Sequence, residues 1–200
     1  MLSCRGIVAI LLACRCSAVV TLPSSAFIID AAMPPWLDAI SSAPVLRELR
    51  ALAALDEASL PLPSPTVKFE ADWQGLTNGA PRSWSSIELL NKGMLSTDGC
   101  AVAPKTCAAL QSQDVAINLS PTVVSPNVGV RLLKLAPGAS LRQHRGPGGR
   151  YVAHLGVQIP PSGASITVGG TTREWVEGGW LMFDDEVLHS ATNAHGALSR

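Results

Sequence analysis

The stretch VAHLGVQIPPSGASITVGG, residues 152–170, contains two short apolar runs, each closed by a turn. The first run ends at the Pro-Pro-Ser-Gly of residues 160–163, and the second ends at Gly169-Gly170. Short aliphatic and β-branched runs between Pro and Gly clusters predict antiparallel strands. The same spacing continues in both directions, through alternating apolar residues at 128–132 and an apolar run at 180–183. We therefore expect a mainly β protein, a sandwich or barrel, and most simply a double-sheet jelly roll.

Composition limits the class of protein. The chain has 200 residues, of which 47% are hydrophobic and 15% are charged, so one domain can bury a real core. Its 15 basic and 15 acidic residues give a formal net charge of zero. A nucleic-acid-binding surface needs clustered excess Lys and Arg, so we expect no nucleic-acid partner.

Residues 1–26 have the composition of a leader. They contain two arginines and no acidic residue, with an apolar run from Gly6 to Cys14 and small residues around Ser24. The run is shorter than the roughly 18 to 20 residues that span a bilayer, so no transmembrane span is evident. We expect a signal for the secretory pathway or the ER lumen. A transit peptide to a plastid, or an ordinary apolar segment of a cytoplasmic protein, remains an alternative.

Helical features precede the strands. Ser42 and Pro44 make a suitable helix start before apolar residues at helical spacing, so residues 36–65 are expected to form a helix and a Pro-rich linker. Pro104 is expected to open a second, short helix. An apolar-polar alternation before the Asn-Lys-Gly of residues 91–93 predicts a strand that ends in a turn.

Only two cysteines lie beyond the expected leader, Cys100 and Cys107. The segment between them is short enough for a disulfide if the two Cα atoms come within about 7 Å. In an oxidising compartment we expect the bridge, and in cytosol two free thiols. A tetrahedral zinc site of four cysteines is excluded in this part of the chain.

All four histidines follow residue 143: His144, His154, His189 and His195. His144 follows a predicted strand, and His189 follows another strand and an acidic turn. Placed on opposite sides of a jelly roll, these two rings could converge at its open end. Imidazole binds Fe, Zn, Cu and Ni, so the pair alone does not identify a metal.

Several short stretches, in this order and at this spacing, resemble the aspartyl/asparaginyl β-hydroxylase domain, a branch of the iron(II)- and 2-oxoglutarate-dependent oxygenases. The resemblance covers residues 72–200. The stretches are Asp72-Trp73, Trp84-Ser85, Ala103-Pro104-Lys105-Thr106-Cys107, His144-Arg145-Gly146-Pro147, His154-Leu155-Gly156-Val157, Trp175-Val176-Glu177-Gly178 and Phe183-Asp184-Asp185 with His189 four residues later.

The resemblance implies a double-stranded β-helix, that is, a cupin-like jelly roll with a helical N-terminal segment. It implies Fe(II), 2-oxoglutarate and O2 as cofactors and cosubstrates. His144 and His189 would hold the metal, and His154 would help to hold 2-oxoglutarate. Arg200 would pair with its distal carboxylate as a guanidinium fork, and Arg150 is a second candidate for that contact.

The resemblance also concerns a carboxylate. Gly146 stands where most related oxygenases have Asp or Glu, and the family lacks this carboxylate, which leaves an open coordination position that could also admit halide. Asp185 would then act beside the metal rather than on it. Adjacent strand residues face opposite ways, so Asp184 and Asp185 are not expected to form a paired acid/base site.

The implied reaction is hydroxylation of Asp or Asn β-carbons in peptides or proteins, with disulfide-rich extracellular domains among the candidate substrates.

Three features depart from the family. Leu133 and Val152 stand where polar cosubstrate contacts are expected, and the family continues through another strand after Arg200, so we expect a domain truncated at its C-terminus. The alternatives are an inactive jelly-roll binding protein or truncated homologue and, as a lesser one, a hydroxylase of lipid acyl chains.

Overall fold

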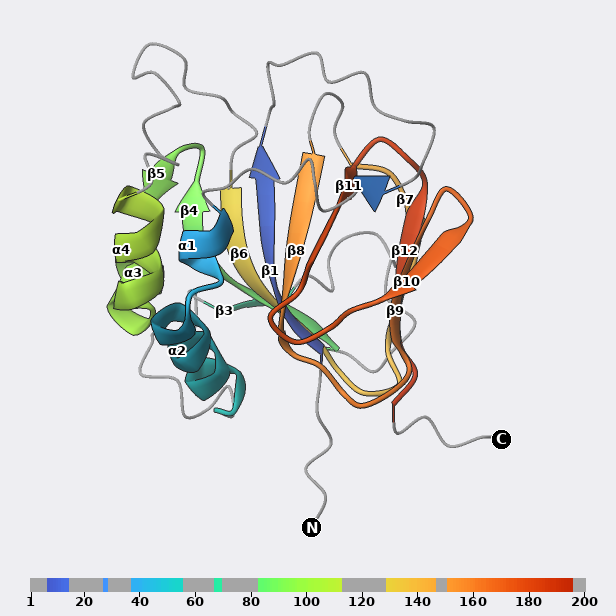
Figure 1. Ribbon diagram of the computed structural model, residues 1–200, viewed down its shortest axis with the longest axis horizontal. Coiled ribbons are helices and arrows are strands. Elements are labelled where there is room, and N and C mark those ends of the chain that lie inside the picture. Colours follow the sequence, from blue (N-terminus) through green and yellow to red (C-terminus); the bar gives the residue numbers. More distant parts are fainter. Residues whose placement is uncertain are drawn as a thin grey trace.

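The computed structural model describes residues 7–14, 27–28, 37–55, 67–69, 83–112, 129–146 and 151–195. This part of the chain is mostly β, with helices gathered on one side (Figure 1). The predicted Pro-rich linker and the Asp72-Trp73 stretch lie outside the described residues. The mainly β prediction is confirmed, and the strands form two sheets rather than a closed barrel.

The larger sheet carries most of the strands. Its order is β2 (Phe27–Ile28), β11 (Trp180–Asp184), β8 (Tyr151–Gln158), β1 (Ile7–Cys14), β6 (Gly129–Leu135), β4 (Trp84–Asn91) and β3 (Val67–Phe69), with β5 (Met94–Leu95) beside β4. The smaller sheet has the order β10 (Thr171–Glu174), β9 (Ala164–Val168), β12 (His189–Asn193) and β7 (Ser140–His144). Every pairing in both sheets is antiparallel.

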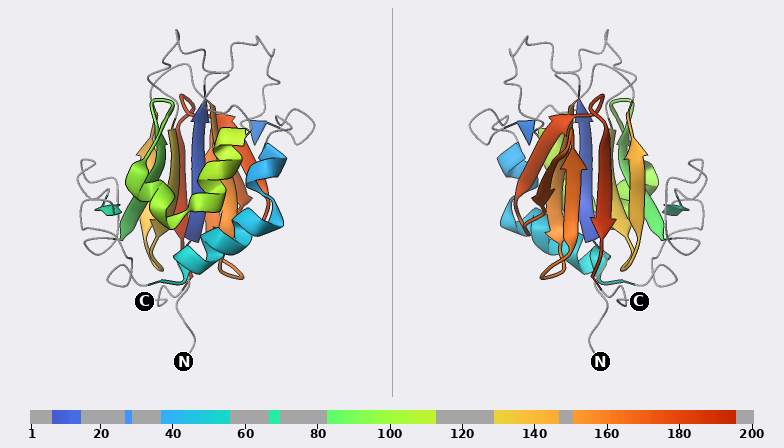
Figure 2. Two further views of the ribbon diagram at one scale, coloured as in Figure 1. Left: turned by 90° about the vertical axis from the view of Figure 1, so that its left-hand side faces the viewer. Right: turned by 90° about the vertical axis from the view of Figure 1, so that its right-hand side faces the viewer.

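Helices cover one face of the larger sheet (Figure 2). They are α1 (Leu37–Ile40), α2 (Ala43–Ala53), α3 (Thr97–Val102) and α4 (Pro104–Ser112). Between helices and sheet lies an apolar cluster that we call the outer core, made of Leu37, Ile40, Val45, Leu49, Ile87, Leu89, Leu90, Ala103, Cys107, Leu110, Val130, Leu132, Ala153, Leu155, Val157 and Met182.

The opposite face of the larger sheet packs against the smaller sheet. The apolar cluster between them, which we call the inner core, contains Phe27, Leu135, Ala139, Val152, Ile159, Ala164, Ile166, Val168, Trp175, Phe183 and Ala191. Along β8, Val152 belongs to the inner core and Ala153 to the outer core. This alternation follows from the two-residue period of a strand, and it decides which side chains can line the space between the sheets.

The local predictions for the first helix and the first hairpin are confirmed. Ser42 has the extended backbone of an N-cap, with Pro44 in the first turn of α2, and Val45 and Leu49 are buried. Strands β4 and β5 are joined by a tight turn in which Lys92 (φ 50°) and Gly93 (φ 79°) both have left-handed backbone conformations.

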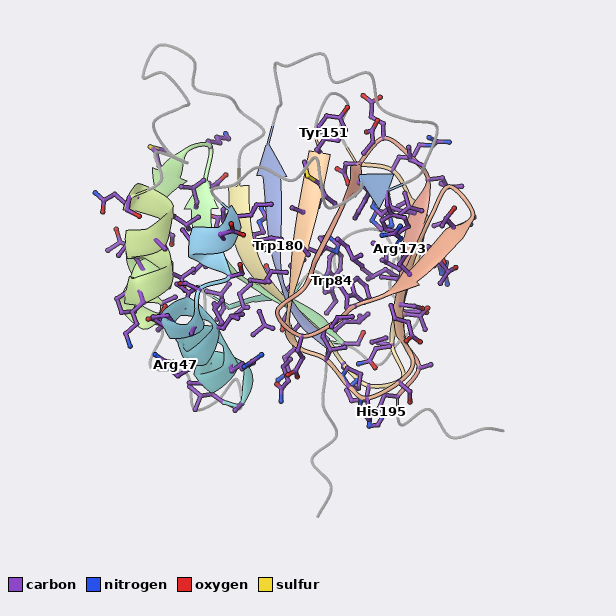
Figure 3. The ribbon with its side chains drawn as sticks, in the orientation of Figure 1. Arg47, Trp84, Tyr151, Arg173, Trp180 and His195 are labelled. Carbon is purple, nitrogen blue, oxygen red and sulfur yellow. A yellow bond between two sulfur atoms is a disulfide. The ribbon has the colours of Figure 1, made fainter. Side chains whose placement is uncertain are left out.

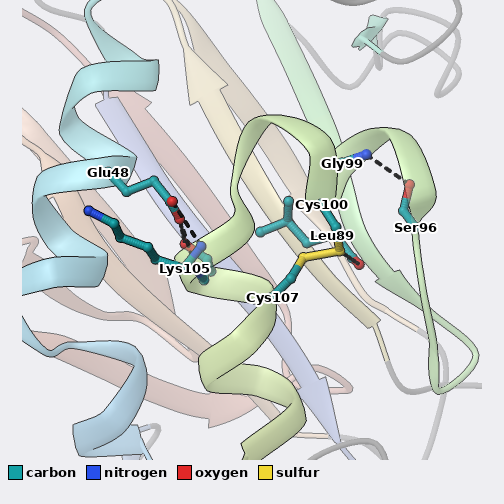
Figure 4. The surroundings of a disulfide bond; sticks show 8 residues. Glu48, Leu89, Ser96, Gly99, Cys100, Lys105 and Cys107 are labelled. Atoms are coloured by element: carbon teal, nitrogen blue, oxygen red, sulfur yellow. Dashed lines mark hydrogen bonds between the residues drawn. A yellow bond between two sulfur atoms is a disulfide. The ribbon is translucent and has the colours of Figure 1, made fainter.

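The helical layer is tied together at the start of α4 (Figure 4). Glu48 of α2 accepts hydrogen bonds from the backbone N–H groups of Lys105 (2.9 Å) and Thr106 (2.7 Å) and from the Thr106 hydroxyl (2.7 Å). Cys100 and Cys107 form the expected disulfide, with their Cα atoms 5.6 Å apart. A carboxylate at a helix N-terminus satisfies donors that would otherwise lack partners, so α2, α3 and α4 are held as one layer.

The apolar run expected inside the leader lies in the larger sheet as β1, between β6 and β8. The other residues of 1–26 lie outside the described part of the chain. Within that part, no helix has the length and apolar character needed to cross a membrane.

Candidate metal centre

His144 and His189 lie side by side at one end of the smaller sheet. They are cross-strand partners on β7 and β12, and their ring centroids are 4.2 Å apart. The expectation that the rings approach from opposite sides of the fold is therefore wrong. Their proximity comes from strand pairing, which sets directly opposed side chains about 5 Å apart.

Each ring is oriented by a short backbone contact. Nδ1 of His144 lies 2.8 Å from the carbonyl oxygen of Arg142, and Nδ1 of His189 lies 2.8 Å from that of Val187. A carbonyl can only accept, so both Nδ1 atoms carry the proton and donate it when the rings are neutral. The lone pair is then on Nε2 in both histidines. This is the tautomer in which a histidine binds a metal through Nε2.

Asp185 lies next to this pair. Its side chain is buried, and its Oδ1 is 3.5 Å from Nε2 of His189. Asp184, in contrast, accepts a hydrogen bond from the backbone N–H of Glu186. The two carboxylates have different partners, as expected for neighbours at a strand end, and they do not form a paired acid/base site.

The absence of a side chain at Gly146 leaves room for the carboxylate of Asp185. A Cβ built on Gly146 would overlap the carboxylate of Asp185. The two residues are also joined through the backbone, because the N–H of Gly146 donates to the carbonyl of Asp185 at 2.8 Å. The volume in which an Asp or Glu at position 146 would place its side chain is therefore already filled by a carboxylate from the neighbouring turn.

This donor set fits a metal with imidazole and oxygen ligands, such as Fe(II). The two imidazole rings lie next to each other, with the carboxylate of Asp185 beside Nε2 of His189. Among the residues that the structure describes, no group of three or more His, Cys, Asp or Glu side chains is arranged as a complete metal site. Two imidazoles and one carboxylate could hold a metal ion only together with ligands from outside the described residues.

His154 projects from β8 into the space between the sheets. Its ring is stacked on Trp175 (centroids 5.9 Å apart, planes 19° apart), and Phe183 lies between it and His189, with centroid distances of 5.2 Å and 5.1 Å. Both ring nitrogens are buried and lack a hydrogen-bond partner within the described residues. Burial, and to a smaller extent the charge on His189, lowers the pKa of His154 to about 3. The ring is neutral at physiological pH.

The position of Trp175 depends on Gly156. A Cβ at Gly156 would overlap the carbonyl oxygen of Val176. Because glycine leaves this space open, the loop after Trp175 lies directly on β8, where Gly178 donates to the carbonyl of Gly156 at 2.7 Å and Gly156 donates to that of Gly179 at 3.0 Å. The sequence pattern His-Leu-Gly thus holds an aromatic ring over the histidine two residues earlier.

One pair of residues was missed by the sequence reasoning. Arg131 of β6 forms an ion pair with Glu88 of β4, with Nη2 and Oε2 3.4 Å apart. Leu11 of β1 is the register partner of both Arg131 and His154, so the three residues form one row across the sheet. Opposite charges at alternating positions of two strands were the available signal. The sequence does not show that these two strands, which are far apart along the chain, are neighbours in the sheet.

The other residues singled out in the sequence lie away from the paired histidines or outside the described part of the chain. Arg150 and Arg200 lie outside the described residues. Val152 and Leu133 are the two apolar residues that stand where the family is expected to have polar ones. Val152 is fully buried in the inner core, and Leu133 is half-buried. His195 lies in a turn at the opposite end of the molecule from Tyr151, the first residue of β8 (Figure 3).

The similarity of the chain to known proteins identifies its family. Residues 43–198 match the family model described as aspartyl/asparaginyl beta-hydroxylase. The chain is 35% identical over 107 residues to the aspartyl/asparaginyl beta-hydroxylase of Mus musculus, 53% of this chain and 14% of that protein. It is 34% identical over 109 residues to aspartate beta-hydroxylase domain-containing protein 2 of Homo sapiens, 54% of this chain and 28% of that protein.

The Xenopus tropicalis protein of the latter name is 32% identical over 138 residues, 62% of this chain and 35% of that protein. The chain thus spans about a third or less of these relatives. The match begins at Ala43, so helix α2 is included in the shared domain. On the family model and these relatives, this chain belongs to the aspartyl/asparaginyl beta-hydroxylase family.

Proposed function

We propose that this protein is a dioxygenase dependent on Fe(II) and 2-oxoglutarate that hydroxylates Asp or Asn β-carbons in peptides or proteins, on a double-stranded β-helix. The observation that carries the proposal is the pair of histidines with both Nδ1 atoms bound to backbone carbonyls. The position of Asp185 in the volume beside Gly146 supports it, because this leaves a two-histidine site with open positions.

Each residue of the site has a role in this proposal. His144 and His189 would hold Fe(II) through Nε2. When bound, the iron with 2-oxoglutarate and O2 supplies the oxidising power that inserts one oxygen atom into a C–H bond and releases succinate and CO2. Asp185 would accept hydrogen bonds from groups bound next to His189.

The cosubstrate carboxylates need cationic or hydrogen-bonding partners. His154 offers two buried nitrogens, one a donor and one an acceptor in its neutral form. Arg200 and Arg150 remain the proposed anchors of the distal carboxylate. Arg131 is a third candidate: its neighbours Val130 and Leu132 belong to the outer core, so its side chain lies on the same side of the larger sheet as His154.

Arg131 can be tested separately from activity. We expect Arg131→Gln to weaken binding of 2-oxoglutarate by at least about tenfold, because a charge-assisted contact to a carboxylate contributes about 1.5 to 3 kcal/mol. Glu88→Gln is the matched control, since it removes the partner carboxylate and keeps the guanidinium. Calorimetric titration of the iron-loaded protein measures both, and an unchanged affinity in Arg131→Gln removes this residue from the anchor set.

The decisive experiment follows labelled 2-oxoglutarate to succinate in air, with iron and a panel of Asp- and Asn-containing peptides that includes disulfide-rich domains. We expect succinate formation coupled to a mass gain of one oxygen atom on a peptide. The His144→Ala protein is the control. The proposal is abandoned if the folded, iron-loaded wild type forms neither product.

A second function has a specific observation in its favour. Val152 and Leu133 are apolar where polar cosubstrate contacts are expected, which favours a jelly-roll binding protein without turnover. A protein that binds peptides from the same panel without forming succinate supports this reading. Fatty acyl substrates in a parallel assay test the third reading, a hydroxylase of lipid acyl chains.

The compartment is part of the proposal. A disulfide between Cys100 and Cys107 persists in an oxidising environment, which supports the secretory pathway or the ER lumen. A plastid and the cytoplasm are the alternatives, and in the cytoplasm both thiols would be reduced. Mass mapping without reduction, on protein from its native compartment, measures the state of this pair.

A further inference from the structure

Strand β1 is the central link of the larger sheet (Figure 1). Ile7–Cys14 pairs antiparallel with β6 on one side, from Ile7 opposite Leu135 to Ala13 opposite Gly129. On the other side it pairs antiparallel with β8, from Val8 opposite Gln158 to Cys14 opposite Tyr151. Because both neighbours are antiparallel to β1, they run parallel to each other, and they do not pair directly.

Without β1 the sheet would divide into two parts. Strands β6 and β8 are two strand spacings apart, about 9.5 Å, which is too far for direct hydrogen bonds. Each would expose a row of unpaired N–H and C=O groups in the middle of the fold, where water has little access. The gap between them accepts one strand, antiparallel to both.

The sequence of β1 suits that gap. Helices cover one face of the larger sheet and the smaller sheet lies on the other, so a central strand there reads as a continuous apolar run. IVAILLAC is such a run, with no charged residue. The same residues are the apolar centre of the expected leader, and one molecule cannot both lose this segment and keep its central strand.

We propose that the gap between β6 and β8 is a strand-acceptor site, that its occupant is the Ile7–Cys14 segment, and that this segment is retained in the working protein as a structural strand. The proposal is independent of the reaction. It also bears on the site, because Leu11 is the register partner of His154, and release of β1 would free the edge of the strand that carries this histidine.

The test uses the full chain with one proline. In Leu11→Pro the ring removes a backbone N–H in the middle of β1, whereas Ala18→Pro places the same residue outside the strand. We expect the unfolding temperature of Leu11→Pro to fall by about 10 °C and that of Ala18→Pro to stay near the wild-type value.

Peptide binding distinguishes loss of a strand from general damage. A labelled peptide of residues 5–13 should bind Leu11→Pro at least about tenfold more tightly than it binds the wild type or Ala18→Pro, because only the first has an open acceptor site. The same peptide with its own Leu11→Pro change should bind none of them. Equal binding by wild type and Leu11→Pro, or equal unfolding temperatures of the two proline variants, would overturn the proposal.

The mature N-terminus gives an independent result. Intact mass of the protein from cells that express it should include residues 7–14. A mature chain that begins after Cys14 contradicts the proposal, whatever the reaction turns out to be.

Discussion

The outer core and the inner core are built from the two faces of the same strands, yet they differ in polarity. In the outer core the buried hydroxyl of Thr106 is bonded to Glu48, and the Trp180 indole is the buried polar group without a partner among the described residues. The inner side carries three nitrogens of this kind, two on His154 and one on Trp175, and one oxygen, Oδ1 of Asn193; the Ser83 hydroxyl, just before β4, also lacks a partner.

This difference in polarity indicates which side of the larger sheet would bind a ligand. A buried polar group without a hydrogen bond destabilises a fold by about 1 to 3 kcal/mol. Apolar residues would fill the space near His154 at no such cost. Unpartnered nitrogens are concentrated around His154, so the inner side is where the proposed function predicts that a bound ion or small molecule supplies the missing partners.

The largest effect is expected for the paired histidines. His144→Ala or His189→Ala removes one of two imidazole ligands, so iron affinity should fall at least about a hundredfold while the β-rich circular dichroism spectrum stays largely intact. Iron content after desalting measures the loss. His195→Ala is the control, since this residue comes after the last residue of β12, whereas His189 is the first residue of that strand. Stoichiometric iron in both variants would refute the assignment.

The next largest effect is expected when a carboxylate is added at position 146, beside that of Asp185. Gly146→Asp forces two carboxylates into one volume, so we expect a loss of roughly 2 to 5 kcal/mol in the free energy of unfolding. The double variant Gly146→Asp/Asp185→Gly should recover most of it, because one carboxylate remains. Urea unfolding compares the three proteins. A single variant as stable as the wild type would show that Asp185 moves aside without difficulty.

The pH dependence of stability tests the burial of His154. Its pKa is about 3 in the folded protein and near 6.5 when unfolded, so the unfolded chain binds more protons between these values. Stability should therefore rise with pH across this window, by about 1.4 kcal/mol per unit, and be lost as pH falls below about 6.5. In metal-free protein, His154→Phe should flatten this dependence between pH 6.5 and 5. A slope identical to that of wild type would place the titration elsewhere.

The smallest effect is expected in the outer layer. Replacing Cys100 and Cys107 by Ser should lower the free energy of unfolding by about 2 kcal/mol, through the chain entropy of a short loop. Iron affinity should not change, because the bridge joins α3 and α4 on the far side of the sheet from the histidines. A loss of iron binding in the folded double variant would mean that the two cores are coupled.

Local sequence was sufficient for features set by neighbouring residues. Ser42 and Pro44 marked the start of α2, and the Asn-Lys-Gly turn marked the end of β4, because caps and tight turns depend on a few adjacent residues. The family motif identified His144 and His189 as a pair. Their placement on neighbouring strands required the register of β7 and β12, which no local pattern encodes.

The rest depends on contacts between distant segments. The filling of the space at Gly146 by Asp185 is a matter of volume between two turns, and glycine reads equally well as a simple turn residue. The apolar composition of β1 fits both the hydrophobic centre of a signal peptide and the central strand of a sheet. Only its pairing with β6 and β8 distinguishes these two interpretations. The ion pair of Arg131 with Glu88 follows from the same long-range pairing.

The cross-strand position of the two histidines affects how the site tolerates insertions and deletions. The register of β12 against β7 shifts between His189 and Ala191. Side chains alternate with a period of two, so adding or deleting one residue between Asp185 and His189 would turn a different side chain toward His144. Substitutions in this turn leave that spacing unchanged. We therefore expect the length of the turn to be far more restricted than its composition.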